Sequence, residues 1–427
     1  MSARETSVRN SNERGTHLDE RQEQGFSARR HRLDTIEGLR GYLALWVVVC
    51  HVLWASGIPL DLTWGINILR VLRQGAYAVD IFVVVSGFVI FLLLDAQKLT
   101  YEQFVLRRYF RLFPLFVTLF LVSIPISQLS MWNVQHASQY LTPEQVMSLS
   151  ENMRLWWQNL YTHIPLHLTM LHGTVPESVL ADSPGSFLIP AWSVSLEWQF
   201  YLVAPLAYGM ATSSNRFLQL GLVAICALMF VAAQGVLPAV NYGATLPFHI
   251  QYFVLGGASY FLYKHRSRIK QPNAWFSVTC GICAILLAIR GVSWTIPVGL
   301  WFAFLGVILE HPSSLTSRVT SLIFTNGLSQ RLGQISYSIY LSHILVIALI
   351  QYVLLRWLPH LTLTAHIVAL LALTLIVTIA LSTGLYRYVE APGIEWGRSV
   401  ARRIAARRAD TTLGEKTVTA NATAVEN

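Results

Sequence analysis

The sequence contains few charged residues. Lys, Arg, Asp and Glu together make up only 12% of its 427 residues, whereas 54% of the residues are hydrophobic. Charged residues are about a quarter of a typical soluble domain, so the composition excludes an ordinary soluble globule. The sequence instead contains apolar runs that are long enough to form helices. We therefore predict an all-α, polytopic membrane protein.

Cysteine and acidic residues are scarce as well. All four cysteines, Cys50, Cys226, Cys280 and Cys283, lie in apolar segments, so no disulfide framework is expected and the CxxC pair is interpreted as core. Basic residues outnumber acidic ones, 31 to 22, which gives a formal net charge of +9. The basic residues gather at the ends of apolar segments and in the tails. Membrane topology explains this excess, so no nucleic-acid partner is expected.

Polar segments frame the apolar part of the chain. Residues 1–32 are predicted to form a disordered cytoplasmic tail without the apolar region of a signal peptide, and their final arginines place this end in the cytoplasm. About ten transmembrane helices are predicted within residues 33–400, with both termini cytoplasmic. They include spans at 33–54, 76–95, 217–234, 246–263, 274–290, 295–309 and 365–386, a third span ending near Ile126 and a fourth opening near residue 191. Residues 401–427 are predicted to be a basic and then polar cytoplasmic tail, disordered from about residue 410.

The longest predicted loop, about residues 129–188, follows the third span on the outer side. It is rich in tryptophan and histidine, and residues 156–171 are predicted to form an interfacial helix. His163 and His167 stand four residues apart, but the pattern places no third ligand, so no metal site is expected. A loop of this length is more often functional than not, and its aromatic faces suit sugar rings.

The first apolar helix carries two ionisable residues, Arg40 near its start and His51 deep inside. Eleven residues at about 100° per residue return nearly to the same face, so both side chains lie on one face, roughly 16 Å apart along the axis. An ionisable side chain in hydrocarbon costs roughly 2.5–3.5 kcal/mol, which points to a functional site. The structural alternative is that Arg40 snorkels to the membrane surface and His51 bonds a neighbouring helix.

Further charged residues lie near the ends of later spans. Asp80 is near the outer end of the second span, where Ser86 and Gly87 allow close helix approach. Glu197 lies among tryptophans and hydroxyls at the start of the fourth span and needs a histidine or arginine partner. Arg107, Arg108 and Arg111 precede the third span, and the last two share a helix face suited to phosphate oxygens. The alternative for these arginines is topology determination alone.

Four blocks, in this order, resemble the acyltransferase 3 family of bacterial membrane acyltransferases over roughly residues 33–400. They are DTIEGLRGYLALWVVVCH with Arg40 and His51, VDIFVVVSGFVI with Asp80, RRYFRLFP with Arg108 and Arg111, and AWSVSLEWQFYLVAPL with Glu197. SYSIYLSH and YRYVEAP are similar to later elements of the family, the second with Ala391 where an arginine is common. The order and spacing of the blocks make the resemblance specific.

The resemblance implies transfer of an acyl group, usually acetyl from acetyl-coenzyme A, to a hydroxyl of a carbohydrate or other acceptor. It implies a multi-pass protein of the cell inner membrane, with His51, Arg40, Asp80 and Glu197 as catalytic residues. The coenzyme's phosphates would be held by Arg107, Arg108 and Arg111. His51 would be the general base, and either Asp80 or Glu197 would orient it. Arg40 would bind the coenzyme or the developing oxyanion.

The acceptor stays open at this stage. A surface polysaccharide, lipopolysaccharide or lipid-linked glycan is the first expectation. A small metabolite such as a macrolide, met from the cytoplasmic side, is the alternative within the same chemistry. A transporter that uses buried charges along a translocation path is a further alternative, although the two halves of the sequence show no convincing internal repeat.

Overall fold

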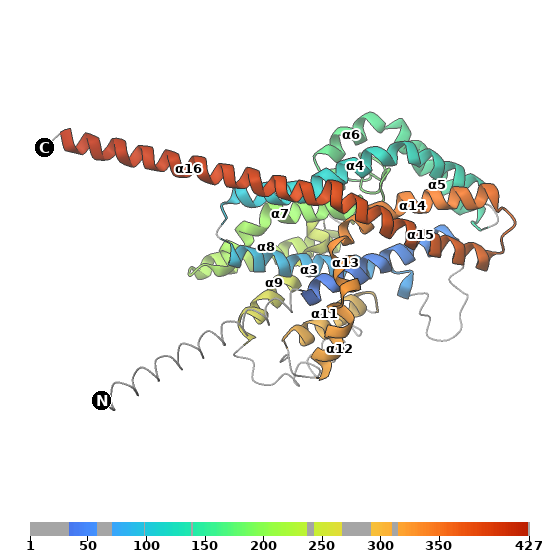
Figure 1. Cartoon of the computed structure of the whole chain (residues 1–427), viewed down its shortest axis with the longest axis horizontal. Helices are drawn as coiled ribbons and strands as arrows, with labels where there is room; N and C mark the ends of the chain where they lie inside the picture. The colour runs from blue at the N-terminus through green and yellow to red at the C-terminus, as the bar shows by residue number, and fades with distance from the viewer. Residues whose placement is uncertain are drawn as a thin grey trace, which may run out of the picture. The chain divides into compact units, whose positions relative to one another are not determined.

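The computed structural model describes residues 34–57, 71–97, 99–137, 140–236, 243–266, 292–309 and 315–425, and all regular structure in these ranges is helical (Figure 1). The helices are Asp34–Ala55, α3 (Gly75–Ala96), α4 (Tyr101–His136), α5 (Pro143–Gln158), α6 (Leu160–Leu168), α7 (Ala191–Thr212), α8 (Arg216–Val231), α9 (Leu246–Lys264), α11 (Val292–Leu309), α12 (Leu315–Phe324), α13 (Gly327–Gln334), α14 (Ser336–Trp357), α15 (Leu363–Leu385) and α16 (Ala391–Val425), with short turns η1 (His172–Thr174), η2 (Ala232–Val236) and η4 (Tyr386–Glu390). The all-α prediction is confirmed for this part of the chain.

Within the described residues, six helical segments are long and apolar enough to cross a membrane: Asp34–Ala55, α3, α4, Arg216–Gln234, α14 and Leu363–Arg408. The expected span that opens near residue 191 is helix α7, and the expected spans at 246–263 and 295–309 are α9 and α11, but these three helices do not belong to the six. The expected span at 274–290 and the N-terminal tail lie outside the described residues. The multi-pass architecture is therefore established, while the number ten and the cytoplasmic placement of both termini stay predictions.

The third span is longer than the sequence indicated. Helix α4 continues to His136, ten residues beyond the predicted end near Ile126, with Pro114 and Pro125 inside it. The added turns contain no glycine, and buried Asn133 donates a hydrogen bond to the carbonyl of Ala348 on α14 at 2.8 Å. This interhelical bond holds the extension in place, because a buried amide needs a partner.

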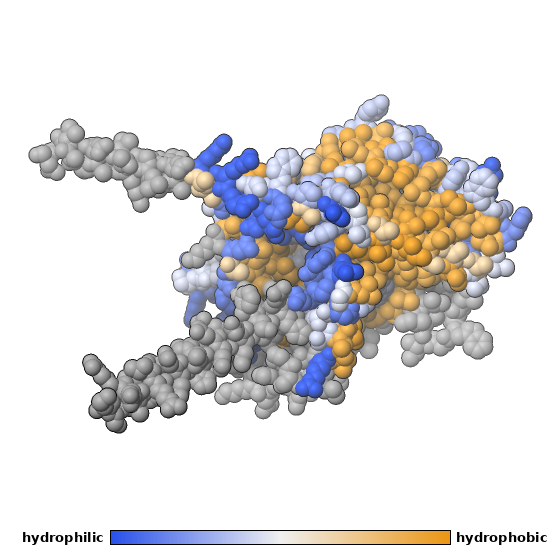
Figure 2. All heavy atoms as spheres, in the orientation of Figure 1, coloured by the Kyte–Doolittle hydropathy of each residue, from blue (hydrophilic) through white to orange (hydrophobic). Residues whose placement is uncertain are grey.

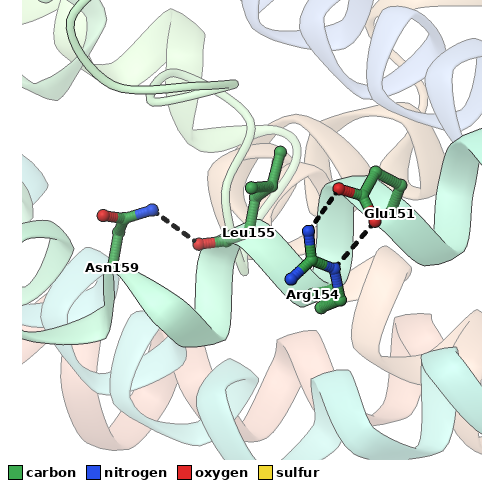
Figure 3. A network of polar contacts seen from close by, with 4 residues as sticks. All are labelled: Glu151, Arg154, Leu155 and Asn159. Atoms are coloured by element: carbon green, nitrogen blue, oxygen red, sulfur yellow. Dashed lines mark hydrogen bonds and ion pairs between the residues drawn. The ribbon is translucent and has the colours of Figure 1, made fainter.

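The segment between α4 and α7 contains two helices where one was predicted over residues 156–171. Helix α5 ends at Gln158 and α6 begins at Leu160. Asn159 separates them and its side-chain amide donates to the carbonyl of Leu155, while Arg154 pairs with Glu151 on the exposed face of α5 (Figure 3). Such a local side-chain bond competes with helix continuation, which explains the break.

The C-terminal tail also differs from the prediction. Helix α16 runs to Val425, so the part expected to be disordered from about residue 410 is helical. Residues 400–408, VARRIAARR, combine alanine and arginine, both strong helix formers. The polar composition after residue 410 suggested disorder, but the helix that includes these turns continues to Val425.

The described residues divide into two compact units, one within residues 34–43 and 263–336 and the other within residues 44–262 and 337–425. In the first unit the glycines of the GLRG motif serve packing. A Cβ atom on Gly41 would lie 2.7 Å from the Cβ of Leu332, and one on Gly38 would overlap the backbone of Phe324. Only glycine allows this approach of the first helix to α12 and α13.

In the second unit α3 and α9 cross at two glycines. A Cβ atom on Gly87 would lie 2.6 Å from the carbonyl oxygen of Phe253, and one on Gly256 would lie 2.8 Å from the backbone nitrogen of Phe88. Small residues at a helix crossing let the two backbones touch, as the Ser86–Gly87 pair predicted. This crossing places α3, which carries Asp80, against α9, which carries His249.

The outer surface of the second unit is strongly apolar. Helix α8 has no buried residue although it is almost entirely hydrophobic, and α15 exposes Val368, Ile376 and Leu381. Figure 2 shows an apolar surface around α4, α14 and α15, with hydrophilic atoms along the basic part of α16. A soluble protein does not expose apolar surface of this extent, so these helices face lipid.

Candidate active site

His51 pairs with a second histidine. His51 Nδ1 lies 2.9 Å from the carbonyl oxygen of Val47, one turn earlier in its own helix, and 3.2 Å from Nε2 of His343 on α14. The two imidazole rings are 4.9 Å apart and inclined by 49°. His343 is fully buried, and its Nδ1 lies 3.2 Å from the carbonyl oxygen of Ile339. A histidine pair inside the apolar helices is therefore the centre of the candidate site.

Neither predicted carboxylate orients His51 through a described contact. Asp80 has its Oδ1 3.7 Å from Nδ1 of His249 on α9 and also bonds the Tyr252 hydroxyl. Glu197 accepts hydrogen bonds from the hydroxyls of Tyr201 and, at 3.2 Å, Ser86. The described partner of Nδ1 of His51 in another helix is His343 on α14, and not a carboxylate of α3 or α7.

The two arginines of the third block are enclosed by acidic and aromatic groups. The guanidinium of Arg108 lies 5.7 Å from the ring centre of Tyr201, whose hydroxyl it also bonds, and its Nε has no partner among the described residues. Arg111 interacts electrostatically with Glu390 and Glu197. These buried charges are compensated within the protein, as charges in a low-dielectric environment must be.

Glu390 is a site residue that the sequence did not single out. Only 2% of its surface is exposed, and Ser338 Oγ on α14 donates a hydrogen bond to it at 2.7 Å. It faces Arg111 from the η4 turn that joins α15 to α16. Its position in YRYVEAP, two residues before Pro392, gave no sign of burial, since Arg387 and two tyrosines stand in the same short block.

Arg107 differs from its two neighbours. It is half-buried and donates from Nη1 to Oε1 of Gln97 at 2.8 Å. Arg398 and Glu395 of α16 lie close enough to interact with it electrostatically. Arg408, further along α16, pairs with Glu102 at 2.6 Å. The basic beginning of α4 and the basic part of α16 therefore lie together.

Arg40 is half-buried on the helix Asp34–Ala55 and belongs to the first unit, whereas His51 on the same helix belongs to the second. The catalytic roles of Arg40, His51, Asp80 and Glu197 stay predictions.

Comparison with known families identifies the chain. Residues 33–383 match the family model described as an acyltransferase domain, which covers all four sequence blocks. The chain belongs to the acyltransferase 3 family. The resemblance drawn from the blocks is confirmed, and the chain is accordingly a membrane-embedded member of an acyltransferase family.

Two relatives carry related names. The chain is 28% identical over 178 residues to the acyltransferase MdmB of Streptomyces mycarofaciens, which is 42% of this chain and 39% of that protein. It is 25% identical over 338 residues to ORF330 of Acidianus two-tailed virus, whose name proposes an acetyltransferase, across 73% of this chain and 82% of that protein. The match to MdmB thus spans about two fifths of that relative's length. No solved structure matches the chain.

The long segment between α4 and α7 holds a buried histidine cluster. His163, His167 and His172 are each fully buried, and the rings of His167 and His172 stack at 4.1 Å between centres. Ser186 Oγ lies 3.0 Å from Nδ1 of His163, and Phe120 stacks on His167 at 4.3 Å. No group of three or more His, Cys, Asp or Glu side chains in the described ranges has the arrangement of a metal site.

Two tryptophans expected to offer faces to sugar rings pack internally instead. The indole of Trp156 donates to Asp182 at 3.1 Å and that of Trp157 to Ser127 at 3.0 Å. Both rings contact Phe187. These aromatics build the core of the segment and are not available as a platform for a carbohydrate.

The histidine cluster makes this segment acid-sensitive. Burial lowers the pKa of His163 and His172 to about 4 and holds that of His167 well below its usual range. The unfolded chain binds protons near pH 6.5, so these histidines contribute stability above that pH and lose it as the pH falls toward 4. Burial raises the pKa of Asp182 to about 6, which contributes stability at low pH that is lost as the pH rises through 6. Three histidines outweigh one carboxyl.

We therefore expect the thermal midpoint of the wild-type protein in detergent to fall when the pH is lowered from 7 to 5. The midpoint should fall less in His172→Phe, because this variant keeps the stack on Phe116 but has one titrating ring fewer. An exposed histidine, changed in His360→Asn, provides the matched control and should show the wild-type drop. Equal drops in all three proteins would contradict the assignment of acid sensitivity to the cluster.

Proposed function

We propose that this protein is a membrane O-acyltransferase that moves an acetyl group from acetyl-coenzyme A on the cytoplasmic side to a hydroxyl of a surface polysaccharide, lipopolysaccharide or lipid-linked glycan at the cell inner membrane. The observation that carries the proposal is His51, an imidazole held inside an apolar helix beside a second buried histidine in a member of an acyltransferase family. Imidazole is the side chain best matched to proton transfer near neutral pH.

The donor side of the proposal rests on the basic ends of two helices. Arg107 of α4 and Arg398 of α16 lie together, and α16 carries further exposed arginines. Basic residues at the ends of spans favour the cytoplasmic face, where acyl-coenzyme A is found. Arginine forks suit phosphate oxygens, so Arg107 would contact the coenzyme's phosphates. Arg108 and Arg111 are already compensated by Tyr201, Glu197 and Glu390. They would attract the coenzyme's phosphates electrostatically without contacting them directly.

The acceptor side of the proposal rests on the general chemistry of acyl transfer. His51 would remove the proton from the acceptor hydroxyl while the oxygen attacks the thioester carbonyl. Collapse of the tetrahedral intermediate would break the C–S bond, and the proton would leave with the thiol. Arg40, on the same helix, would bind the donor or stabilise the developing oxyanion. Asp80 and Glu197 would fix the helices around this site through their contacts with His249 on α9 and Ser86 on α3.

The test is mass spectrometry of surface glycans from cells in which the gene is deleted and then restored. We expect a mass shift of one acyl group to disappear on deletion, to return with the wild-type gene and with the exposed-site variant His360→Asn, and to stay absent with His51→Ala. Immunoblotting of membranes would establish that all variants are present in equal amount.

Two results would each contradict a different part of the proposal. Normal acylation by His51→Ala would contradict the assignment of His51 as the general base. Glycans of unchanged mass in the deletion strain and in every restored strain would contradict the glycan as acceptor. The same variants would then be tested with small hydroxylated metabolites as acceptors.

A further inference from the structure

The hydrogen bonds around the histidine pair assign a tautomer to each ring. A ring nitrogen close to a carbonyl oxygen must carry the proton, because two lone pairs in contact repel each other. Nδ1 of His51 faces the carbonyl of Val47, and Nδ1 of His343 faces the carbonyl of Ile339. Both rings are therefore protonated on Nδ1 when neutral.

This assignment fixes which nitrogen of each ring carries a proton and which has a lone pair. Nδ1–H of His51 is shared between the carbonyl of Val47 and the lone pair on Nε2 of His343, 3.2 Å away. Nε2 of His51 is left with a lone pair and hydrogen-bonds to no residue in the described part of the chain. The atom available to accept a proton is thus Nε2.

We propose that His343 is the positioning residue of His51: it accepts Nδ1–H, keeps the basic lone pair on Nε2, and shares the proton that His51 takes up. The part that concerns catalysis rests on the proposed function. When the acceptor hydroxyl gives its proton to Nε2, Nδ1–H of His51 moves toward Nε2 of His343, and the positive charge spreads over two imidazoles. As the C–S bond breaks, the shared proton returns to Nδ1 of His51, and the proton on Nε2 passes to the coenzyme thiolate, which leaves as the thiol.

The absence of a carboxylate from this pair has a physical reason. An ionised carboxylate in the apolar interior needs full compensation, and Asp80 and Glu197 are engaged elsewhere. A neutral imidazole accepts a hydrogen bond without bringing a permanent charge into the membrane. A histidine partner therefore performs the orienting role at lower desolvation cost.

Kinetics of two variants of His343 test the positioning role. His343→Leu removes the acceptor, and we expect kcat to fall at least tenfold with KM for the acyl donor changed less than twofold. His343→Gln offers an amide oxygen that accepts Nδ1–H but takes up no proton, so it should restore part of the lost kcat. The matched control is His366→Leu, a buried histidine of α15 that stacks on Tyr140 and should keep wild-type kcat. Wild-type kcat in His343→Leu would overturn the proposal, and so would equal loss in the leucine and glutamine variants.

A measurement without turnover tests the pair independently of the proposed function. In ¹⁵N-histidine-labelled protein in bilayers, solid-state NMR should show a correlation between protonated Nδ1 of one ring and unprotonated Nε2 of another. The correlation should vanish in His51→Gln and His343→Leu and persist in His366→Leu. A signal for His51 protonated on Nε2 at neutral pH would overturn the proposal. If the correlation is present but no acceptor is ever acylated, the pair stands and the proposed function fails.

Discussion

Arg111→Met is expected to lower the free energy of unfolding by about 3–5 kcal/mol, the cost typical of leaving a buried ionic partner uncompensated. Arg111 on α4 faces Glu390 from the η4 turn and Glu197 from α7. Removing the guanidinium leaves both carboxylates in an apolar interior without this positive charge, while Ser338 still donates a hydrogen bond to Glu390. We expect little folded protein in detergent and a strongly lowered thermal midpoint.

A double variant separates the charge balance from packing. Glu390→Gln alone leaves Arg111 with one carboxylate fewer and should also destabilise the protein. The pair Arg111→Met with Glu390→Gln removes one charge of each sign, so it should regain much of the lost stability, which is the signature of direct coupling in a double-mutant cycle. Arg154→Met with Glu151→Gln, an exposed pair on α5, is the control and should change the midpoint very little. Additive losses in the buried pair would contradict the coupling.

The same double variant decides how Arg111 serves the reaction. If the protein folds and its KM for acyl-coenzyme A matches the wild type, Arg111 acts in the structure alone. A raised KM in the folded double variant would keep Arg111 within the proposed phosphate site. The alternative of topology determination alone fits Arg107 better than Arg111, because Arg107 lies beside Arg398 and Glu395 of α16 whereas Arg111 interacts with Glu390 and Glu197.

The sequence predicted those features that depend on local pattern. The first helix, expected over 33–54, is Asp34–Ala55, the second, expected over 76–95, is Gly75–Ala96, and the span expected over 365–386 is Leu363–Leu385. Each is a long apolar run bounded by polar residues, and such runs fix a helix within a few residues. The four blocks that indicate the family are local sequence patterns as well, and the family match over residues 33–383 confirms them.

The partners inside the site could not be predicted in this way. His343 stood in the quoted block SYSIYLSH without a role, because periodicity gives the face of a helix but not which neighbour it meets. Asp80 and Glu197 were expected near His51 on grounds of charge alone. The Asp80–His249 contact follows from how α3 and α9 pack, which the sequence specifies only through small residues at the crossing. The Glu197–Tyr201 contact joins residues four apart on α7, and helical periodicity alone could have indicated it.

Gly256→Ala, at the strongest of these crossings, is expected to destabilise the protein by about 1–3 kcal/mol through overpacking. A Cβ atom at this position would overlap the carbonyl oxygen of Val84 and approach the backbone nitrogen of Phe88. Both are backbone atoms of α3, which cannot rotate away as a side chain does, so the two helices must separate. Separation would also pull His249 on α9 away from Asp80 on α3.

Gly209→Ala gives a matched control, because Gly209 lies in α7 and an added Cβ would meet no atom within 4 Å. Both substitutions gain the same intrinsic helix propensity, up to about 1 kcal/mol, so the difference between them isolates the crossing. We expect Gly209→Ala to match or exceed the wild-type midpoint, and Gly256→Ala to fall clearly below it and to lose monodisperse protein on size-exclusion chromatography. Equal midpoints would mean that α3 and α9 do not touch through their backbones. The Asp80–His249 contact would then need another support.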